Sequence, residues 1–363
     1  MPDSLLATLF PDASFLPVND KLYVAAREHL DRLTKPVGSL GELERVATRL
    51  YAINGGRTPI RVDPALLYIV AGDHGIAARD VSPYPQAITR RMAANFLEGG
   101  AASNVICRAS RIHHRMIDAG CAGEPFAPHP LLLDRRLGSG TADITLGPAM
   151  SVATCEGGLR AGFALSLEAA QNGYALLATG EIGIANSSSA AALFCALLGL
   201  KPEDAVGPGA GAPPAMIARK TEMIHKALEA NAQAIESGNP VRILAAVGGF
   251  ELVILAGLML GCASQRLPFV VDGYICASAY AAARALFAPI SDYAFFSHQP
   301  AEPGFARAFE KLAPLQTPLL NLAMRLGEGT GAALAIPILR SAAAIYNEMA
   351  TFETAARNAE RGK

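Results

Sequence analysis

The sequence lacks the short patterns that assign nucleotide or metal chemistry directly. It has no Cys-x-x-Cys pair, and its six cysteines lie far apart along 363 residues. It has no Gly-x-x-x-x-Gly-Lys-Ser/Thr loop, and no Gly-x-Gly-x-x-Gly opens a helix after an early strand. These absences exclude a P-loop, a dinucleotide fingerprint, a zinc cluster and a dense disulfide framework. The cysteines are predicted to be reduced core thiols.

The chain also lacks a surplus of charge and a long apolar run. Its formal net charge is −1 with Lys and Arg scattered, so no basic face for nucleic acid is indicated and a small-molecule partner is expected. The longest apolar stretch, Leu252–Ala263, is shorter than the ~20 residues of a membrane span. Residues 1–7 carry an early acid and lack the basic start and apolar core of a signal peptide. A cytoplasmic protein without a membrane span is therefore predicted.

Short apolar runs alternate with helical segments over most of the chain. Apolar residues make up 51% of the sequence against 17% charged residues, which is enough to bury a large core. The alternation predicts an α/β fold with a Rossmann-like, mostly parallel sheet, helices on both faces and right-handed crossovers. The strands are predicted at 66–71, 116–120, 174–178, 269–273 and 293–296.

The chain is longer than a typical domain of ~100 to 200 residues, so a second unit is predicted. Helical periodicity over residues 21–33 and 40–54 predicts a hairpin of helices, and the final helix is expected to end near Met349. We expect residues 1–58 and 331–363 to form a small helical domain beside a large α/β catalytic domain of residues 59–330. The last ten residues are expected to be frayed.

Two glycine-rich stretches each place a carboxylate before an apolar helix. Arg325–Ile338 holds Glu328 between glycines, and Thr179–Ala192 holds Glu181 after an apparent strand. Glycines bring backbone N–H groups close to a ligand, and a helix N-terminus favours an anion at the same place. Glu328 is either a carboxylate poised for chemistry or an acid in the first helical turn that answers the helix dipole.

Three other polar segments leave their roles open. Asp73 and His74 follow a strand, and they are metal ligands, an acid/base pair or members of a hydrogen-bonded turn. The proline-restrained loop Ser82–Gln86 holds either pocket residues or a helix start with a packed tyrosine. His298 follows the last strand as a pocket residue or part of a capped turn.

Six segments in one order carry a family resemblance from about residue 34 to 350. The sequence resembles nicotinate-nucleotide:dimethylbenzimidazole phosphoribosyltransferases, which build the lower-ligand nucleotide of cobalamin. The resemblance implies the fold predicted above and a homodimer. The six segments are the two glycine-rich stretches and Ala71–Ile76, Ser82–Gln86, Gly99–Asn104 and Gly248–Glu251.

The resemblance also implies roles for individual residues. Glu328 matches the family's general base, and Lys35 lies in a family signature that supplies charge to an active site, its own or a neighbour's. Lys220 matches a lysine on the phosphate side, although a solvated helix lysine explains it equally well. Pro208 and Ala210 depart from the arginine and threonine expected there. The base-binding residues implied are Ser82, Tyr84, Gln86 and Leu326, and the phosphate- and ribose-binding residues are Glu181, Gly183, Ile184, Asn186, Ser187, Lys220 and Ser297.

The implied reaction transfers phosphoribose from nicotinate mononucleotide to 5,6-dimethylbenzimidazole, giving α-ribazole 5′-phosphate and nicotinate. Enzymes that use phosphoribosyl pyrophosphate carry paired acids for ribose and magnesium, and this sequence has no Asp-Asp. A mononucleotide donor needs only an anion cradle, so a site without metal or cofactor is expected. Two alternatives stay open, a relative that uses a purine or phenolic acceptor and a non-catalytic nucleotide sensor.

Overall fold

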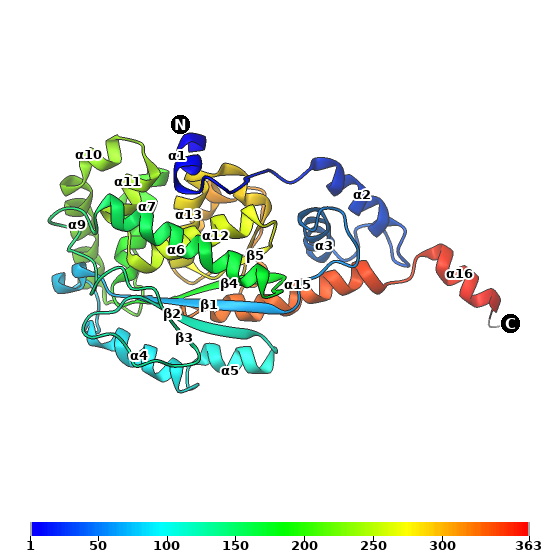
Figure 1. Cartoon of the computed structure of the whole chain (residues 1–363), viewed down its shortest axis with the longest axis horizontal. Helices are drawn as coiled ribbons and strands as arrows, with labels where there is room; N and C mark the ends of the chain where they lie inside the picture. The colour runs from blue at the N-terminus through cyan, green and yellow to red at the C-terminus, as the bar shows by residue number, and fades with distance from the viewer. Residues whose placement is uncertain (1, 362–363) are drawn as a thin grey trace.

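The computed structural model describes residues 2–361 and is built on one six-stranded parallel sheet (Figure 1). The strand order is β3-β2-β1-β4-β5-β6, and every pairing between neighbouring strands is parallel. This confirms the predicted α/β fold. The strands are β1 (Ala65–Gly72), β2 (His113–Gly120), β3 (Leu132–Asp134), β4 (Leu176–Ile182), β5 (Phe269–Val271) and β6 (Ala294–Phe296).

The direction of strand addition reverses between β1 and β4. From β1 the chain adds β2 and β3 on one side, and from β4 it adds β5 and β6 on the other. The two central strands are buried along their whole length, which explains the apolar sequence of β1 and the apolar start of β4. In such sheets, ligands bind outside the carboxyl ends of the strands where the order reverses. The topology therefore points to the carboxyl ends of β1 and β4.

Helices cover both faces of the sheet (Figure 1). On one face α12 (Phe250–Ser264) and α13 (Tyr274–Leu286) pack on the central strands, with α6 (Val152–Gln171), α7 (Asn186–Leu198) and α11 (Pro240–Val247) behind them. On the other face lie α4 (Ala87–Leu97), α5 (Ala102–Ala109) and α15 (Thr330–Glu348). Helix α12 is buried almost all round because it lies between the sheet and α6, and this explains its unbroken apolar sequence.

The N- and C-terminal segments do not behave alike. Helix α15 runs from the sheet to α3, and α3 packs against α2, so these helices form a unit that stands beside the sheet (Figure 1). Helix α1 instead packs on α6 and α13, where Phe10 stacks on Phe163 with ring centroids 4.2 Å apart. The boundaries of the small helical domain stay a prediction. The expected fraying is wrong for residues 354–361, which belong to α16, and residues 362–363 lie outside the described part.

Two expectations about burial can be compared with the structure. All six cysteines are free and buried, as predicted. Among residues 2–361, no helix combines the length and apolar character needed to cross a membrane. The helices are α1 (Pro2–Leu9), α2 (Asp20–Asp31), α3 (Glu42–Ile53), α4 (Ala87–Leu97), α5 (Ala102–Ala109), α6 (Val152–Gln171), α7 (Asn186–Leu198), α8 (Pro202–Ala205), α9 (Pro214–Ala230), α10 (Ala232–Glu236), α11 (Pro240–Val247), α12 (Phe250–Ser264), α13 (Tyr274–Leu286), α14 (Pro303–Leu312), α15 (Thr330–Glu348) and α16 (Phe352–Arg361), with 3-10 turns at Gly75–Arg79 and Ala288–Asp292.

Candidate active site

A cavity of about 450 Å³ opens at the carboxyl ends of the central strands, where the topology places a ligand. Segments that follow β1, β4, β5 and β6 line it, together with the stretch before α15. Most of its exposed lining is apolar, with a few polar groups that converge on it. The polar and charged lining residues are Ser82, Thr89, Glu181, Asn186, Ser187, Lys220, Asp272, His298, Glu302, Arg325 and Glu328.

Glu328 reaches this cavity from a strained backbone position. Its φ is 59°, and its neighbours Gly327 and Gly329 also have positive φ values of 84° and 73°. Its N–H donates to the carbonyl oxygen of Glu181 at 3.1 Å, which ties the segment to β4. A Cβ at Gly180 would lie 2.5 Å from the Gly329 nitrogen, so a glycine is required there for the close approach. The strain is held in place by surrounding contacts, as is common at functional sites.

The alternative role for Glu328, an acid in the first helical turn, is wrong. Helix α15 begins at Thr330 with Gly329 as its N-cap, and the first turn contains no acid. The Glu328 side chain is 6% exposed, and within residues 2–361 its carboxylate has no hydrogen-bond partner. A carboxylate that faces a cavity without a partner is available to a ligand.

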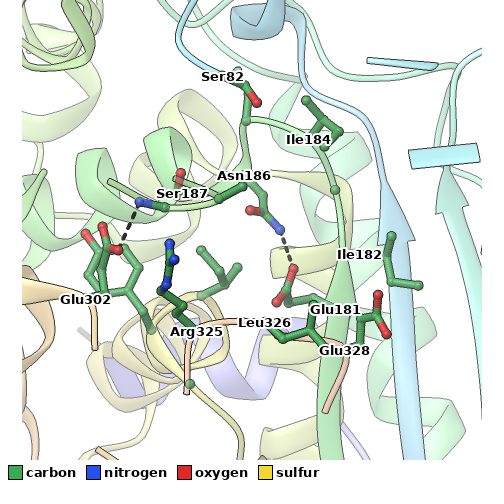
Figure 2. Close-up of a pocket in the computed structure, with 18 of the residues that line it drawn as sticks. Ser82, Glu181, Ile182, Ile184, Asn186, Ser187, Glu302, Arg325, Leu326 and Glu328 are labelled. Atoms are coloured by element: carbon green, nitrogen blue, oxygen red, sulfur yellow. Dashed lines mark hydrogen bonds between the residues drawn. The ribbon is translucent and has the colours of Figure 1, made fainter. Parts of the chain in front are cut away.

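Three carboxyl groups share one side of the cavity, and Figure 2 shows two of them, Glu181 and Glu328, close together. Burial raises the pKa of Glu181 to about 8, and the negative charge of Asp272 adds to the rise. Burial also raises the pKa of Asp272, which His298 partly opposes. The pKa of Glu328 is raised by burial and by Asp272. Because like charges in a buried site oppose one another, these carboxyls disfavour ionisation of their neighbours, and Glu181 mostly holds its proton near neutral pH.

Glu181 is held by a neighbour in the same loop. The side-chain N–H of Asn186 donates to Glu181 Oε2 (Figure 2). Asn186 is the first residue of α7, so this bond fixes the carboxyl against the start of that helix. The two glycine-rich stretches meet in the structure, because Glu181 and Glu328 line one cavity.

Cationic side chains gather on another side of the cavity. Lys220 Nζ donates to Ser187 Oγ at 3.1 Å and to the Gly207 carbonyl oxygen at 2.8 Å. Lys220 is 1% exposed, so the alternative of a solvated helix lysine is wrong. Arg325 and Glu302 lie close to each other (Figure 2). Burial raises the pKa of Glu302, and the charges of Lys220 and Arg325 partly oppose this rise. We call Gly183, Ile184, Asn186, Ser187 and Lys220 the anion cradle; all five line the cavity, with the start of α7 pointing into it.

The residues implied to bind the base are only partly brought together. Ser82, Tyr84 and Leu326 line the cavity, and Tyr84 and Leu326 are 50% and 57% exposed. Gln86 does not line it, and its amide nitrogen lies instead beside Gly140. Gln86 precedes α4 and makes no side-chain cap.

Ser297 also lies outside the cavity lining, whereas its neighbour His298 lies within it. The Ser297 side chain is fully buried, and its hydroxyl donates to the Asp272 carbonyl oxygen at 2.5 Å. His298 Nδ1 lies 2.9 Å from Ser297 Oγ, and a Cβ at Gly331 would clash with its ring. The open question about His298 is settled in favour of a pocket residue.

The Asp73 and His74 turn contributes no side chain to the lining. His74 is fully buried between Glu251 and Ser189, at 2.8 Å and 3.0 Å. Within residues 2–361, no three His, Cys, Asp or Glu side chains gather closely enough to hold a metal ion. The hydrogen-bonded turn is therefore the interpretation that the structure supports.

Two other sequence features can be placed. Lys35 pairs with Glu44 of α3 at 2.8 Å and lies away from the cavity of its own chain. Pro208 and Ala210, which depart from the family pattern, both line the cavity beside Lys220. The departures therefore alter the cationic side of the site.

Sequence reasoning missed Asp272, Glu302 and Arg325. Asp272 follows β5 and precedes a glycine, and Glu181 stands at the end of β4 two residues before a glycine, so this shared pattern could have found Asp272. Arg325 opens one of the two glycine-rich stretches, but the pattern assigns it no role there. Glu302 carries no signal in the sequence, because a proline-rich loop brings it to the cavity.

Comparison with known proteins decides the family. A family model described as "Phosphoribosyltransferase" matches residues 16–356. A protein of Nitratidesulfovibrio vulgaris strain DP4, named nicotinate-nucleotide–dimethylbenzimidazole phosphoribosyltransferase, is 50% identical over 93% of this chain and 94% of its own length. The chain belongs to the nicotinate-nucleotide:dimethylbenzimidazole phosphoribosyltransferase family. A relative of the same name from Solidesulfovibrio magneticus is also 50% identical, over 94% of this chain and 96% of its own.

The fold of this phosphoribosyltransferase family is also seen in a solved structure. The crystal structure of the enzyme of that name from Thermus thermophilus superposes with a TM-score of 0.87 at 40% identity. It covers 93% of this chain and 98% of its own. The family resemblance inferred from the six sequence segments is confirmed.

Proposed function

We propose that this enzyme transfers phosphoribose from nicotinate mononucleotide to 5,6-dimethylbenzimidazole. A benzimidazole nitrogen attacks C1′ of the donor, the bond from C1′ to the nicotinate nitrogen breaks, and nicotinate leaves as the α-ribosyl product forms. One observation carries the proposal: a carboxylate without a partner, Glu328, faces a cavity whose other side holds Lys220 and Arg325. The cations suit a phosphate, and the carboxylate suits a proton that must be removed.

The base is proposed to lie between Ser82, Tyr84, Leu326 and Glu328. Tyr84 and Leu326 present exposed apolar surface to a flat ring, and the Ser82 hydroxyl can bond to its edge. As C1′ bonds to one ring nitrogen, the other ring N–H becomes acidic, and Glu328 accepts its proton. General-base catalysis of this kind contributes roughly 10² to 10⁴-fold.

The Asp272 carboxyl beside Glu328 is proposed to assist in a second way. Breaking the bond to nicotinate leaves positive charge on the ribose ring, and a negative group fixed in a desolvated site stabilises such charge. Asp272 lies on this side of the cavity, whereas Glu181, whose pKa is raised to about 8, is mostly protonated near neutral pH and does not supply this charge. Nicotinate departs from a cationic ring and needs no proton from an acid. No step requires a metal ion or a cofactor.

The donor phosphate is proposed to lie in the anion cradle. The Lys220 ammonium, the Ser187 hydroxyl and the start of α7 all converge there. Gly183 serves the cradle indirectly, because its missing Cβ would lie 2.5 Å from the Gly72 carbonyl oxygen, not in the cavity. Gly183→Val would therefore disturb the contact between β1 and β4, so Lys220→Met is the sharper test. It should raise the KM for nicotinate mononucleotide and leave the binding of dimethylbenzimidazole unchanged.

Incubation with nicotinate mononucleotide and a panel of bases, with released nicotinate as the readout, tests the proposed function. Fastest release with dimethylbenzimidazole supports it. Fastest release with a purine or a phenol would assign another acceptor. Binding of the mononucleotide without release by any base would indicate a nucleotide sensor.

We also propose that the enzyme is a cytoplasmic homodimer. Six buried free cysteines agree with a reducing compartment. Helices α2, α3 and α16 stand beside the sheet (Figure 1), where Val24, Val37 and Phe352 are 50%, 71% and 61% exposed. Sedimentation equilibrium should give a dimer that Phe352→Ser weakens. A monomer at micromolar concentration would contradict the assignment.

A further inference from the structure

Two glycine-bounded sequence segments meet behind the cavity and form a buried histidine–glutamate pair that the proposed chemistry does not use. His74, from the turn after β1, places Nε2 2.8 Å from Glu251 Oε1 in the first turn of α12. Both side chains are 0% exposed. Burying such a pair costs free energy, and replacing it with apolar residues is often neutral or stabilising. Its presence therefore calls for a reason other than stability.

Two of the surrounding glycines, Gly72 and Gly249, make room for this pair. A Cβ at Gly249 would clash with His74 Cε1 and would lie 2.6 Å from Glu251 Oε2. A Cβ at Gly72 would lie 2.9 Å from Glu251 Oε2. Gly72 and Gly249 are thus explained by this pair, whereas Gly75 and Gly248 are required by the backbone of residues 141–143 and of Leu244.

The other ring nitrogen of His74 contacts helix α7, whose first residues belong to the anion cradle. His74 Nδ1 lies 3.0 Å from Ser189 Oγ, and Ser189 belongs to the first turn of α7. That helix starts without a capping side chain, because its N-cap is Ala185 in a left-handed conformation with φ of 71°. Its first turn must therefore be held by contacts from elsewhere. One such contact is the bond from the Ile184 N–H to Thr89 Oγ1 at 3.0 Å.

We propose that His74, oriented by Glu251, positions the first turn of α7 through Ser189 and so fixes the anion cradle for the donor phosphate. His74, Glu251 and Ser189 are positioning residues, since none of them lines the cavity. The inference rests on the proposed place of the phosphate. Loss of the contact lets the turn that carries Asn186 and Ser187 shift, which weakens the hold on the mononucleotide while the base side stays intact.

The chain offers a matched pair of variants for the test. Ser189→Ala removes the hydroxyl that contacts His74, whereas Ser188→Ala removes the hydroxyl of its neighbour on α7. Both serines are at most 1% exposed, and among residues 2–361 the Ser188 hydroxyl has no hydrogen-bond partner. Any general effect of deleting a buried hydroxyl from this helix is therefore common to both variants.

Ser189→Ala should raise the KM for nicotinate mononucleotide by about tenfold, the effect of losing one good hydrogen bond, with kcat at saturation within about threefold of wild type. Ser188→Ala should leave both constants near wild type. The Kd for dimethylbenzimidazole should be unchanged in both variants, and thermal melting should show that both are folded. Equal effects of the two substitutions, or a change in base binding after Ser189→Ala, would overturn the proposal.

A second comparison addresses the role of Glu251. Glu251→Gln keeps an oxygen that can accept from His74 Nε2 and should retain a KM close to wild type, whereas Glu251→Leu should raise it. Equal KM values in the two variants would overturn the orienting role. Lys220→Met separates this inference from the phosphate assignment beneath it. If Lys220→Met raises the KM and Ser189→Ala does not, the cradle stands and the positioning is wrong; if neither does, both are wrong.

Discussion

Replacing Glu328 with glycine should make the enzyme more stable and far less active. A non-glycine residue in the left-handed region costs about 1 to 2 kcal/mol, and Glu328 has φ of 59°. Glycine removes that strain, but the unfolded chain gains conformational freedom at this position, which lowers the free energy of unfolding by about 0.5 to 1 kcal/mol. Loss of a buried carboxylate beside Asp272 adds a further gain. The expected net gain is about 1 kcal/mol.

Thermal melting and steady-state kinetics on Glu328→Ala and Glu328→Gly measure this prediction. Both variants remove the carboxylate, but only glycine relieves the backbone. At about 2.1 cal/mol/K per residue, 1 kcal/mol corresponds to a rise in Tm of about 1 °C for a chain of this size. We expect glycine to be the more stable of the two, with kcat lost in both. Ala323→Gly is the control, since Ala323 also has a positive φ, 53°, and lies outside the cavity lining.

A glycine variant less stable than the alanine variant would refute the strain argument. Activity close to wild type in either variant would refute the role of the carboxylate. Ala323→Gly should gain stability by a similar amount and keep its activity. Should it also lose activity, the effect of the glycine at residue 328 could not be assigned to the lost carboxylate.

Three further predictions concern protons and metals. Burial and Asp272 raise the pKa of Glu328. We therefore expect kcat to fall as the pH drops, with a midpoint above the ordinary glutamate pKa of about 4.3. A midpoint at or below that value would count against Glu328 as the base. Burial raises the pKa of Glu181 from 4.5 to about 8, so this group stabilises the folded state fully below pH 4.5 and loses that contribution as the pH rises to about 8. Glu181→Gln should therefore make the free energy of unfolding, measured in urea, fall less steeply with rising pH. Parallel pH profiles for the variant and the wild type would contradict this prediction. Residues 2–361 provide no cluster of metal ligands, and the sequence has no Asp-Asp pair, so activity should persist in excess EDTA. If EDTA abolished the activity and magnesium or zinc restored it, the prediction of a metal-free site would be overturned.

The central architecture could be predicted from the sequence because its signals are local. Strand β1 is an apolar run that ends in a glycine, and β4 begins with an apolar run before Thr179, Gly180 and Glu181; a parallel strand buried on both faces needs such a run. Strand β3 has three residues at the edge of the sheet and is too short to leave a periodic signal. Helix α16 escapes prediction because its position at the terminus outweighs its amphipathic pattern.

The candidate site could be predicted where the backbone itself carries the information. Glycines around Glu328 and after Glu181 mark turns that approach a ligand, and both residues line the cavity. The direction of a side chain depends on tertiary contacts, which adjacency in sequence does not supply. Gln86 and Ser297 stand near lining residues in the chain yet lie outside the cavity, whereas Glu302 reaches it from a loop without a recognisable pattern.

The most direct test of the account is the kcat of Glu328→Gln measured with saturating nicotinate mononucleotide and dimethylbenzimidazole, beside the Kd for the base. Glutamine keeps the size of the side chain and a hydrogen-bonding oxygen but cannot take a proton. The account predicts that kcat falls by about two orders of magnitude or more while the Kd changes far less, as expected of an interaction made mainly in the transition state. A folded variant with kcat close to wild type would contradict the assignment of Glu328 as the general base.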